Sequence, residues 1–295
     1  MRIVTTTEEL REAIRDSSAN TVGFVPTMGY LHSGHTTLFD HARKQNDLVV
    51  ASIFVNPTQF GPNEDFEVYP RDPEGDAAKC RAHGVRLLFM PSVAEVYPDG
   101  HATTVTVDHL TTELCGRFRP GHFAGVATVV AKLFCMVGSQ RAYFGEKDFQ
   151  QLAVIRRMAR DLNIPTRVIG IPTIREDDGL ARSSRNVYLS DEERAVALSL
   201  ATALRATRAA HRAGERSASA LCDLLAAELT RHPTVALQYA ELADPESLKL
   251  LRGTTLEAGQ GARAIIALQL GRTRLIDNAA IDHDDPSFLT TRLGA

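Results

Sequence analysis

The chain has 295 residues, of which 44% are hydrophobic and 23% are charged, and its net charge at pH 7 is −3. This composition is typical of a globular protein, and the length exceeds that of one ordinary domain, so we expect two domains. The slight negative charge argues against a basic face for nucleic acid, and no apolar run is long enough to span a bilayer.

The first part of the chain alternates between strand and helix patterns. Strands are expected at 21–25, 48–55, 85–90 and 142–144. Helices are expected from Thr7 and at 36–45, 72–83, 125–137 and 148–162. This alternation predicts the α/β class, with a Rossmann-like doubly wound parallel-sheet domain over residues 1–174.

A different pattern follows over residues 175–295. Ser190 with Glu193 forms a capping box that should open one long Ala-rich helix, and a second helix should run from about Ser217 to before Pro233. Three strands are expected in succession, at 237–242, 264–270 and 273–277. Gly271-Arg272 suits a hairpin turn, so we expect a smaller α+β domain with an antiparallel sheet, ending in a loose polar tail at 282–295.

The four cysteines are widely scattered and form no CxxC pair. We therefore expect free thiols in a reducing compartment. Cys135 lies within an apolar run and is expected in the core. Because the N-terminus has no signal-peptide pattern either, the expected location is the cytoplasm.

The run from Pro26 to His35 connects a predicted strand to a predicted helix and contains Met28, Gly29, His32 and His35. Backbone N–H groups and the positive end of the helix meet at such a turn, which suits a polyphosphate, and His32 and His35 can face one anion. The run nearly matches a P-loop, but His35 stands where the P-loop lysine should be, which disfavours a kinase. Taken alone, the turn could equally be a Gly-rich loop with solvent-facing histidines.

Two other predicted strand ends carry polar side chains. Asn56 and Gln59 follow one strand, where ligands bind in doubly wound sheets, and they suit a small polar substrate. Gly145, Glu146, Lys147 and Asp148 follow another. A lysine near a helix N-terminus opposes the helix dipole, so an anionic ligand would compensate it, although pairing of Lys147 with its acidic neighbours is an alternative.

The segment 175–186 holds three arginines, two serines and a glycine. Such a segment can close over a triphosphate, or it can be a polar interdomain linker, and the segment alone favours the linker.

Together these segments resemble the pantothenate synthetase (pantoate–β-alanine ligase) family of the nucleotidylyltransferase superfamily, which has an HxGH motif. The resemblance covers about residues 1–281 in the same order and spacing. It rests on these matching pieces: Pro26-Thr27-Met28-Gly29, Leu31-His32, Gly34-His35, Phe54-Val55-Asn56-Pro57, Gln59-Phe60, Tyr69-Pro70-Arg71, His122-Phe123, Gly125-Val126, Phe144 to Asp148, Gln151, Ser183-Ser184-Arg185-Asn186 and Thr273 to Asn278.

The resemblance implies an ATP-dependent condensation of D-pantoate with β-alanine that gives pantothenate, AMP and diphosphate through a pantoyl adenylate. It also implies small-molecule substrates, no nucleic acid or membrane partner, and a homodimer. Mg²⁺ should accompany ATP, because polyphosphate binds a hard cation. The second domain should act as a lid that keeps water from the adenylate, with a hinge at 175–186.

The resemblance also implies residue roles. The catalytic set would be His32, His35, Lys147 and Arg185. ATP would be bound by Pro26, Met28, Gly29, His32, His35, Gly145, Glu146, Lys147, Asp148, Ser183, Ser184 and Arg185, with Asp148 near the ribose. Pantoate would be held by Asn56, Gln59 and Gln151.

Two positions depart from the family pattern. An acidic pair linked to the metal in the family corresponds here to Gly75 and Asp76, so Asp76 is the remaining candidate metal ligand, and the adjacent Glu74 could substitute for the missing carboxylate. Arg182 stands where the family usually has an apolar residue, and it could either add a cation above the phosphates or point to solvent.

Three alternatives remain open: a related adenylyltransferase, a P-loop-like kinase and a non-catalytic nucleotide-binding regulator. Their products differ, because only the ligase releases AMP and diphosphate in a reaction that needs both pantoate and β-alanine. The kinase would release ADP, and the regulator would bind nucleotide without turnover.

Overall fold

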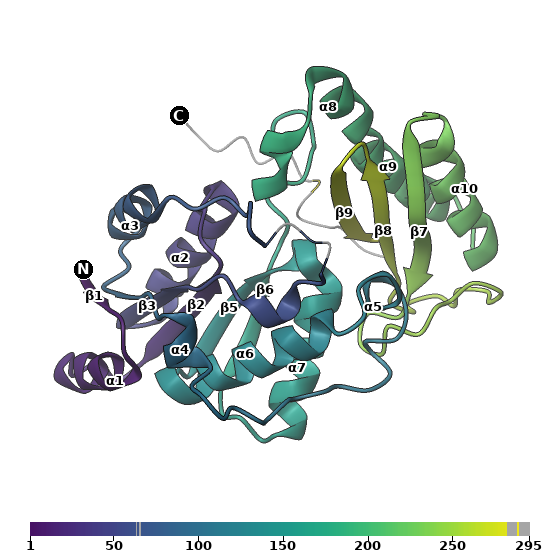
Figure 1. Ribbon diagram of the computed structural model, residues 1–295. Coiled ribbons are helices and arrows are strands. Elements are labelled where there is room, and N and C mark those ends of the chain that lie inside the picture. Colours follow the sequence, from purple (N-terminus) through teal and green to yellow (C-terminus); the bar gives the residue numbers. More distant parts are fainter. Residues whose placement is uncertain (63, 65, 282–287, 289–295) are drawn as a thin grey trace. The chain divides into compact units, whose positions relative to one another are not determined.

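The computed structural model describes residues 1–62, 64, 66–281 and 288. They form two compact units (Figure 1): unit 1 comprises Met1–Glu146 and Val154–Ile171, and unit 2 comprises Lys147–Ala153 and the described residues from Pro172 onward. The lid and hinge roles expected for residues 175–295 and 175–186 stay predictions. The tail predicted at 282–295 lies outside the described residues, apart from Phe288.

Unit 1 contains a six-stranded parallel sheet with the strand order β1-β4-β3-β2-β5-β6. Its strands are β1 (Arg2–Val4), β2 (Val22–Thr27), β3 (Leu48–Ile53), β4 (Leu87–Phe89), β5 (Arg141–Gly145) and β6 (Arg167–Ile171). The central strand β3 is buried over most of its length, as expected for a parallel strand that is covered on both faces.

Successive residues of a strand point to opposite faces of the sheet, and helices cover both faces. On one face, Val25 and Tyr143 belong to a cluster with Phe39 of α2 (Ser33–Gln45) and Cys80 of α3 (Pro73–Ala82). On the other face, Phe24 and Phe144 make edge contacts with Phe134 of α6 (His122–Val137). The remaining elements between β1 and β6 are α1 (Thr7–Asp16), η1 (Pro57–Gln59), α4 (Val93–Val96), α5 (Cys115–Phe118), η2 (Glu146–Asp148) and α7 (Phe149–Asp161).

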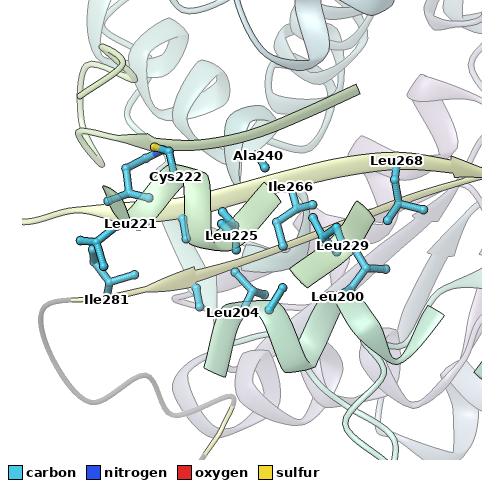
Figure 2. Close-up of a cluster of buried hydrophobic side chains, with 14 of the residues drawn as sticks. Leu200, Leu204, Leu221, Cys222, Leu225, Leu229, Ala240, Ile266, Leu268 and Ile281 are labelled. Carbon is cyan, nitrogen blue, oxygen red and sulfur yellow. The ribbon is translucent and has the colours of Figure 1, made fainter. Parts of the chain in front are cut away.

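Unit 2 contains an antiparallel three-stranded sheet in the order β7-β8-β9. Its elements are η3 (Ser184–Tyr188), α8 (Asp191–Ala197), α9 (Ser199–Arg212), α10 (Ala218–Thr230), β7 (Val235–Ala243), β8 (Arg263–Leu270) and β9 (Thr273–Ala280). Figure 2 shows the core of this unit, in which Leu204 of α9 and Leu225 of α10 pack with Ile266 of β8. The fold class expected from the sequence, a Rossmann-like parallel sheet followed by a smaller α+β part, is therefore confirmed.

Most predicted elements are confirmed with shifted ends. Asp72 caps α3 with Pro73 at its first position, Ser217 caps α10, and a tight turn at Gly271 joins β8 to β9. Helices α2 and α6 each begin three residues before the predicted first residue. The strand β6 was not predicted, because its residues are only partly buried and show no clear period.

Two expectations were wrong. The capping box at Ser190 does open a helix, but that helix ends at Ala197. Its C-cap Leu198, whose N–H bonds to the carbonyl of Val196, is also the N-cap of α9. The predicted single helix is therefore two. Cys135 is exposed, whereas Cys80, Cys115 and Cys222 are buried, because the buried side of α6 is formed by neighbours such as Phe134 and Val137.

Within the part of the chain that the structure describes, no helix combines the length and the apolar character needed to cross a membrane.

Candidate active site

The turn after β2 has an unusual backbone conformation. Gly29 and Tyr30 both have positive φ, +88° and +50° respectively. Glycine is favoured at position 29 by its positive φ, and a Cβ there would be tightly placed, 3.0 Å from Asp76 Oδ2 and 3.1 Å from a methyl group of Ile53. Tyr30 adopts a conformation that side chains other than glycine rarely adopt, which indicates that its surroundings hold it in place.

The two histidines predicted to bind ATP lie together at the start of α2. His32 is the N-cap, and its Nδ1 accepts a hydrogen bond from the N–H of Gly34 at 3.1 Å. Nδ1 of His35 accepts one from the N–H of His32 at 3.3 Å, and the ring centroids are 4.2 Å apart. Because both Nδ1 atoms accept, each neutral ring carries its proton on Nε2, where it can be donated to an anion.

This histidine pair occupies the position in the sheet where ligands are expected. β2 has β3 on one side and β5 on the other, so the chain builds the sheet outward in two directions from these strands. In open parallel sheets, ligands bind at the carboxyl ends of strands at such a reversal. The turn at Met28–His35 follows the carboxyl end of β2, and α2 directs its positive end toward the same region.

Asn56 and Gln59, predicted to hold pantoate, lie in and beside η1 and are almost fully buried. The amide nitrogen of Asn56 donates to Gln59 Oε1 at 3.1 Å and to the carbonyl of Gly125 at 3.2 Å. Its oxygen accepts from the hydroxyls of Tyr97 (2.8 Å) and Thr58 (3.0 Å). Asn56 thus supports Gln59, whose own amide nitrogen lies 3.1 Å from Met28 Sδ. Direct contact of either amide with pantoate stays a prediction.

Three residues without a role predicted from the sequence, His122, Arg119 and Glu64, fix this loop. His122 Nδ1 donates to the carbonyl of Gln59 at 2.8 Å, and its Nε2 lies 3.0 Å from Nη1 of Arg119. Arg119 also forms a two-bond ion pair with Glu64, at 2.6 and 2.5 Å. The residue types alone could not reveal this pairing, because Glu64 and Arg119 are far apart in the sequence.

Two pKa values in this network are shifted. Burial raises the pKa of Glu64, but the hydrogen bond and the charge of Arg119, together with a backbone hydrogen bond from Gly61 and a smaller effect of His122, outweigh burial, so the pKa lies below its ordinary value. Burial raises the pKa of Tyr97, only partly offset by its bonds to Thr58 and Asn56. Tyr97 is therefore a neutral hydroxyl donor to Asn56.

Gly125 of α6 permits the close approach of the loop. A Cβ at this position would lie 2.4 Å from the carbonyl oxygen of Thr58 and 2.8 Å from Cα of Gln59. These are backbone atoms, which cannot move aside as a flexible side chain can. Glycine is therefore required for α6 to pack against η1.

Unit 2 carries Lys147, Asp148 and Gln151. The backbone of Lys147 is fixed by Asn278 of β9, whose amide nitrogen donates to the Lys147 carbonyl at 2.8 Å. The side-chain oxygen of Asn278 accepts a hydrogen bond from Nε of Arg263 at 2.6 Å. The guanidinium of Arg263 lies 4.0 Å from the centre of the Phe149 ring. Asn278 is a supporting residue that the sequence analysis recognised only as part of a matching strand.

The segment 175–186 of unit 2 is an ordered hairpin-like loop. Arg175 pairs with Ala181, and Glu176 N–H bonds to the carbonyl of Leu180 at 2.8 Å. The guanidinium of Arg175 forms two bonds to the buried carboxylate of Asp277, at 2.7 and 3.0 Å. This ion pair anchors the base of the loop to β9.

The serines and arginines of this loop follow directly on the hairpin. Ser183 caps η3 by accepting from the N–H of Arg185 at 3.2 Å, and Asn186 donates to Glu176 at 3.1 Å. Arg182, the departure from the family pattern, is partly buried, and its Nε has no hydrogen-bond partner among the described residues. Burial of Nε argues against a side chain that simply points to solvent.

The predicted site residues divide between the units. Unit 1 holds Pro26, Met28, Gly29, His32, His35, Asn56, Gln59, Asp76, Gly145 and Glu146. Unit 2 holds Lys147, Asp148, Gln151, Ser183, Ser184 and Arg185. Their roles toward substrates stay predictions.

The candidate metal ligand Asp76 does not fit that role. Its side chain is 1% exposed, and each of its oxygens accepts a backbone N–H from the turn after β2. Among residues 1–62, 64, 66–281 and 288, no group of three or more His, Cys, Asp or Glu side chains is arranged to hold a metal ion.

Comparison with known proteins agrees with this architecture. The family model described as pantoate-beta-alanine ligase matches residues 2–280. The chain belongs to this family. A pantothenate synthetase of Herpetosiphon aurantiacus is 51% identical over 278 residues, which is 94% of this chain and 99% of that protein.

Solved structures of the family have the same fold. The crystal structure of pantothenate synthetase from Thermus thermophilus has a TM-score of 0.91 and 51% identity, and covers 96% of this chain and 100% of that chain. A pantoate-beta-alanine ligase from Francisella tularensis, complexed with Beta-gamma ATP and beta-alanine, has a TM-score of 0.77 and 33% identity over 97% of this chain and 99% of that chain. The resemblance inferred from the sequence motifs is therefore confirmed.

Proposed function

We propose that the chain is a pantoate–β-alanine ligase that condenses D-pantoate with β-alanine at the expense of ATP, releasing AMP and diphosphate. Membership of the ligase family over residues 2–280 carries this conclusion. The paired histidines at the carboxyl end of β2 support it, because their Nε2–H groups and the helix end suit phosphate.

The proposed reaction has two steps. The ionised carboxylate of pantoate attacks the α-phosphorus of ATP, diphosphate leaves, and a pantoyl adenylate forms. The deprotonated amine of β-alanine then attacks the acyl carbon, and AMP leaves as the amide forms. Neither step needs a covalent intermediate with the enzyme, so alignment of reactants and stabilisation of charge on the leaving phosphates supply the catalysis.

The proposed residue roles are those that the family resemblance implies. In unit 1, His32 and His35 would donate to phosphate oxygens, with Pro26, Met28, Gly29, Gly145 and Glu146 near the nucleotide, and Asn56 and Gln59 would define the pantoate position. In unit 2, Lys147, Ser183, Ser184 and Arg185 would bind the phosphates, Asp148 the ribose, and Gln151 pantoate. Lys147 and Arg185 provide positive charge to offset the charge that develops on diphosphate.

Mg²⁺ is proposed to arrive with ATP, because phosphate oxygens and water are its preferred ligands. No step is assigned to a protein-bound metal. We also propose a homodimer, which the family resemblance implies, and a cytoplasmic location, which the scattered cysteines indicate.

The test is a coupled assay with each substrate omitted in turn. Formation of AMP and diphosphate only when ATP, D-pantoate and β-alanine are all present supports the ligase. ADP as the product, an adenylylated product that retains AMP, or nucleotide binding without turnover would each overturn it, in favour of a kinase, an adenylyltransferase or a regulator.

A further inference from the structure

The carboxylate of Asp76 is buried at a position where a charge is costly. It lies in the first part of α3, where its N–H bonds to the carbonyl of Asp72 at 2.8 Å, and its side chain is 1% exposed. The ammonium of Lys79 is 3.9 Å from Oδ1. A buried carboxylate is retained only where hydrogen bonds compensate for lost water, so its partners indicate its role.

Those partners are two successive backbone amides of the turn after β2. The N–H of Tyr30 donates to Oδ2, and the N–H of Leu31 donates to Oδ1, both at 2.7 Å. These are short bonds to a charged acceptor, which is the stronger class of hydrogen bond. One side chain on α3 therefore fixes the backbone of a turn that is more than forty residues earlier in the chain.

The residues that Asp76 holds are the ones whose conformation needs support. Gly29 and Tyr30 are both in the left-handed region, at φ +88° and +50°. The chain then passes through Leu31 to His32, the N-cap of α2, whose N–H bonds to His35. A change in the backbone at Tyr30 and Leu31 would move both imidazoles together.

Asp76 is poorly suited to bind Mg²⁺ directly. The ion requires oxygen ligands at about 2.0–2.1 Å in octahedral geometry and usually retains several waters. Here both oxygens face backbone N–H groups, and burial leaves almost no access for water.

We propose that Asp76 is a positioning residue, not a metal ligand: it holds the Gly29–Leu31 turn in the conformation that presents His32 and His35 to the nucleotide. The inference rests on the proposed function, since it concerns the ATP site of the same reaction. Asp76 would therefore affect the use of ATP indirectly, by fixing the turn that precedes His32 and His35.

The test compares Asp76→Asn with Glu67→Gln, which removes an exposed carboxylate from the preceding loop. Asparagine keeps the size but directs an NH₂ group at one of the two backbone N–H donors. We expect kcat/KM for ATP to fall on the order of 10- to 10²-fold, as for a small misplacement of reacting groups. The Mg²⁺ concentration for half-maximal activity at saturating ATP should stay unchanged, and Glu67→Gln should match the wild type in both measurements.

Two kinetic outcomes would overturn the inference. One is wild-type kcat/KM for ATP in folded Asp76→Asn. The other is a raised Mg²⁺ requirement that Mn²⁺ restores, which would identify a metal ligand. Both differ from failure of the proposed function, in which the wild-type chain itself would form no AMP from the three substrates.

A measurement on the wild-type chain keeps the inference testable if the variant does not fold. In amide NMR spectra, the N–H groups of Tyr30 and Leu31 should resonate downfield and exchange slowly, because each donates a short bond to a carboxylate. Addition of Mg²⁺ without ATP should leave both signals in place. Rapid exchange of these amides, or their displacement by Mg²⁺ alone, would refute the assignment.

Discussion

Lys147 combines a positively charged side chain with a backbone that is fixed by a hydrogen bond. Its backbone carbonyl accepts from buried Asn278, so the start of α7 is fixed to β9 while the ammonium remains on a partly exposed side chain. We expect Lys147→Ala to lower kcat roughly 10²–10³-fold, because it removes a charge-assisted contact to the phosphates. Steady-state pantothenate formation measures the loss.

The matched control for this prediction is Lys249→Ala, which removes an exposed lysine from the same unit. It should leave kcat unchanged. Wild-type kcat in the Lys147 variant would exclude the phosphate role.

At this scale, contiguous patterns were easier to predict from the sequence than contacts between residues far apart in the chain. His32 and His35 were found because an HxGH run is contiguous. The contacts of Asp76 could not be predicted, because its partners are the backbone amides of Tyr30 and Leu31, and every residue type except proline has such an amide. The hydrogen bonds of the Asn56 amide to Gln59 and Gly125 likewise could not be predicted, and contact of Asn56 with pantoate stays a prediction.

At the scale of elements, α6 and η1 depend on one glycine. Gly125→Ala would place a methyl group 2.4 Å from the carbonyl oxygen of Thr58, so the loop that carries Gln59 must shift. We expect KM for pantoate to rise on the order of 10-fold or more. KM for ATP in the same variant is the internal control and should change much less, and equal effects on both constants would contradict the prediction.

The ion pair between Arg175 and Asp277 links the 175–186 loop to β9. Its side chains are 6% and 1% exposed, so loss of one partner leaves a buried charge without compensation. We expect Asp277→Ala to lower the free energy of unfolding by about 3–5 kcal/mol. Urea denaturation monitored by circular dichroism would measure it.

The double variant Arg175→Met with Asp277→Leu is the control for this pair. Because it removes both charges and retains apolar volume, its loss of stability should be smaller than that of Asp277→Ala. A double variant as unstable as the single one would show that the charges themselves are not the source of the effect.

Predicted elements were right where their signals are local and wrong where packing decides. Asp72 with Pro73 and the capping box at Ser190 are local, and each begins a helix as predicted. The break at Leu198 has no glycine or proline to mark it, so the Ala-rich pattern was read as one helix. Cys135 likewise lies on the exposed face of α6, although its neighbours in the sequence are apolar.

At the scale of the whole molecule, stability should depend on pH through Glu64. Because Arg119 keeps the pKa of Glu64 lower in the folded chain than in the unfolded chain, the stabilisation is complete above the unfolded value of about 4.3. It is lost as the pH falls through the folded value. Between these two pH values, the wild type should therefore lose more stability on acidification than Glu64→Gln.

Thermal unfolding of both proteins over a pH series measures this difference. Glu67→Gln, which removes an exposed carboxylate from the same loop, is the control and should follow the wild-type curve. Parallel curves for the wild type and Glu64→Gln would rule out the proposed linkage.

The cysteine arrangement offers a means of attaching probes. Burial raises the pKa of Cys80 to about 12 and that of Cys222 to about 11, so neither forms the reactive thiolate readily, and Cys115 is shielded from solvent. Cys135 on α6 is the exposed thiol of the four. A maleimide dye should therefore modify the native protein at a single defined position without any engineered substitution, which makes α6 a ready-made attachment point for fluorescence measurements.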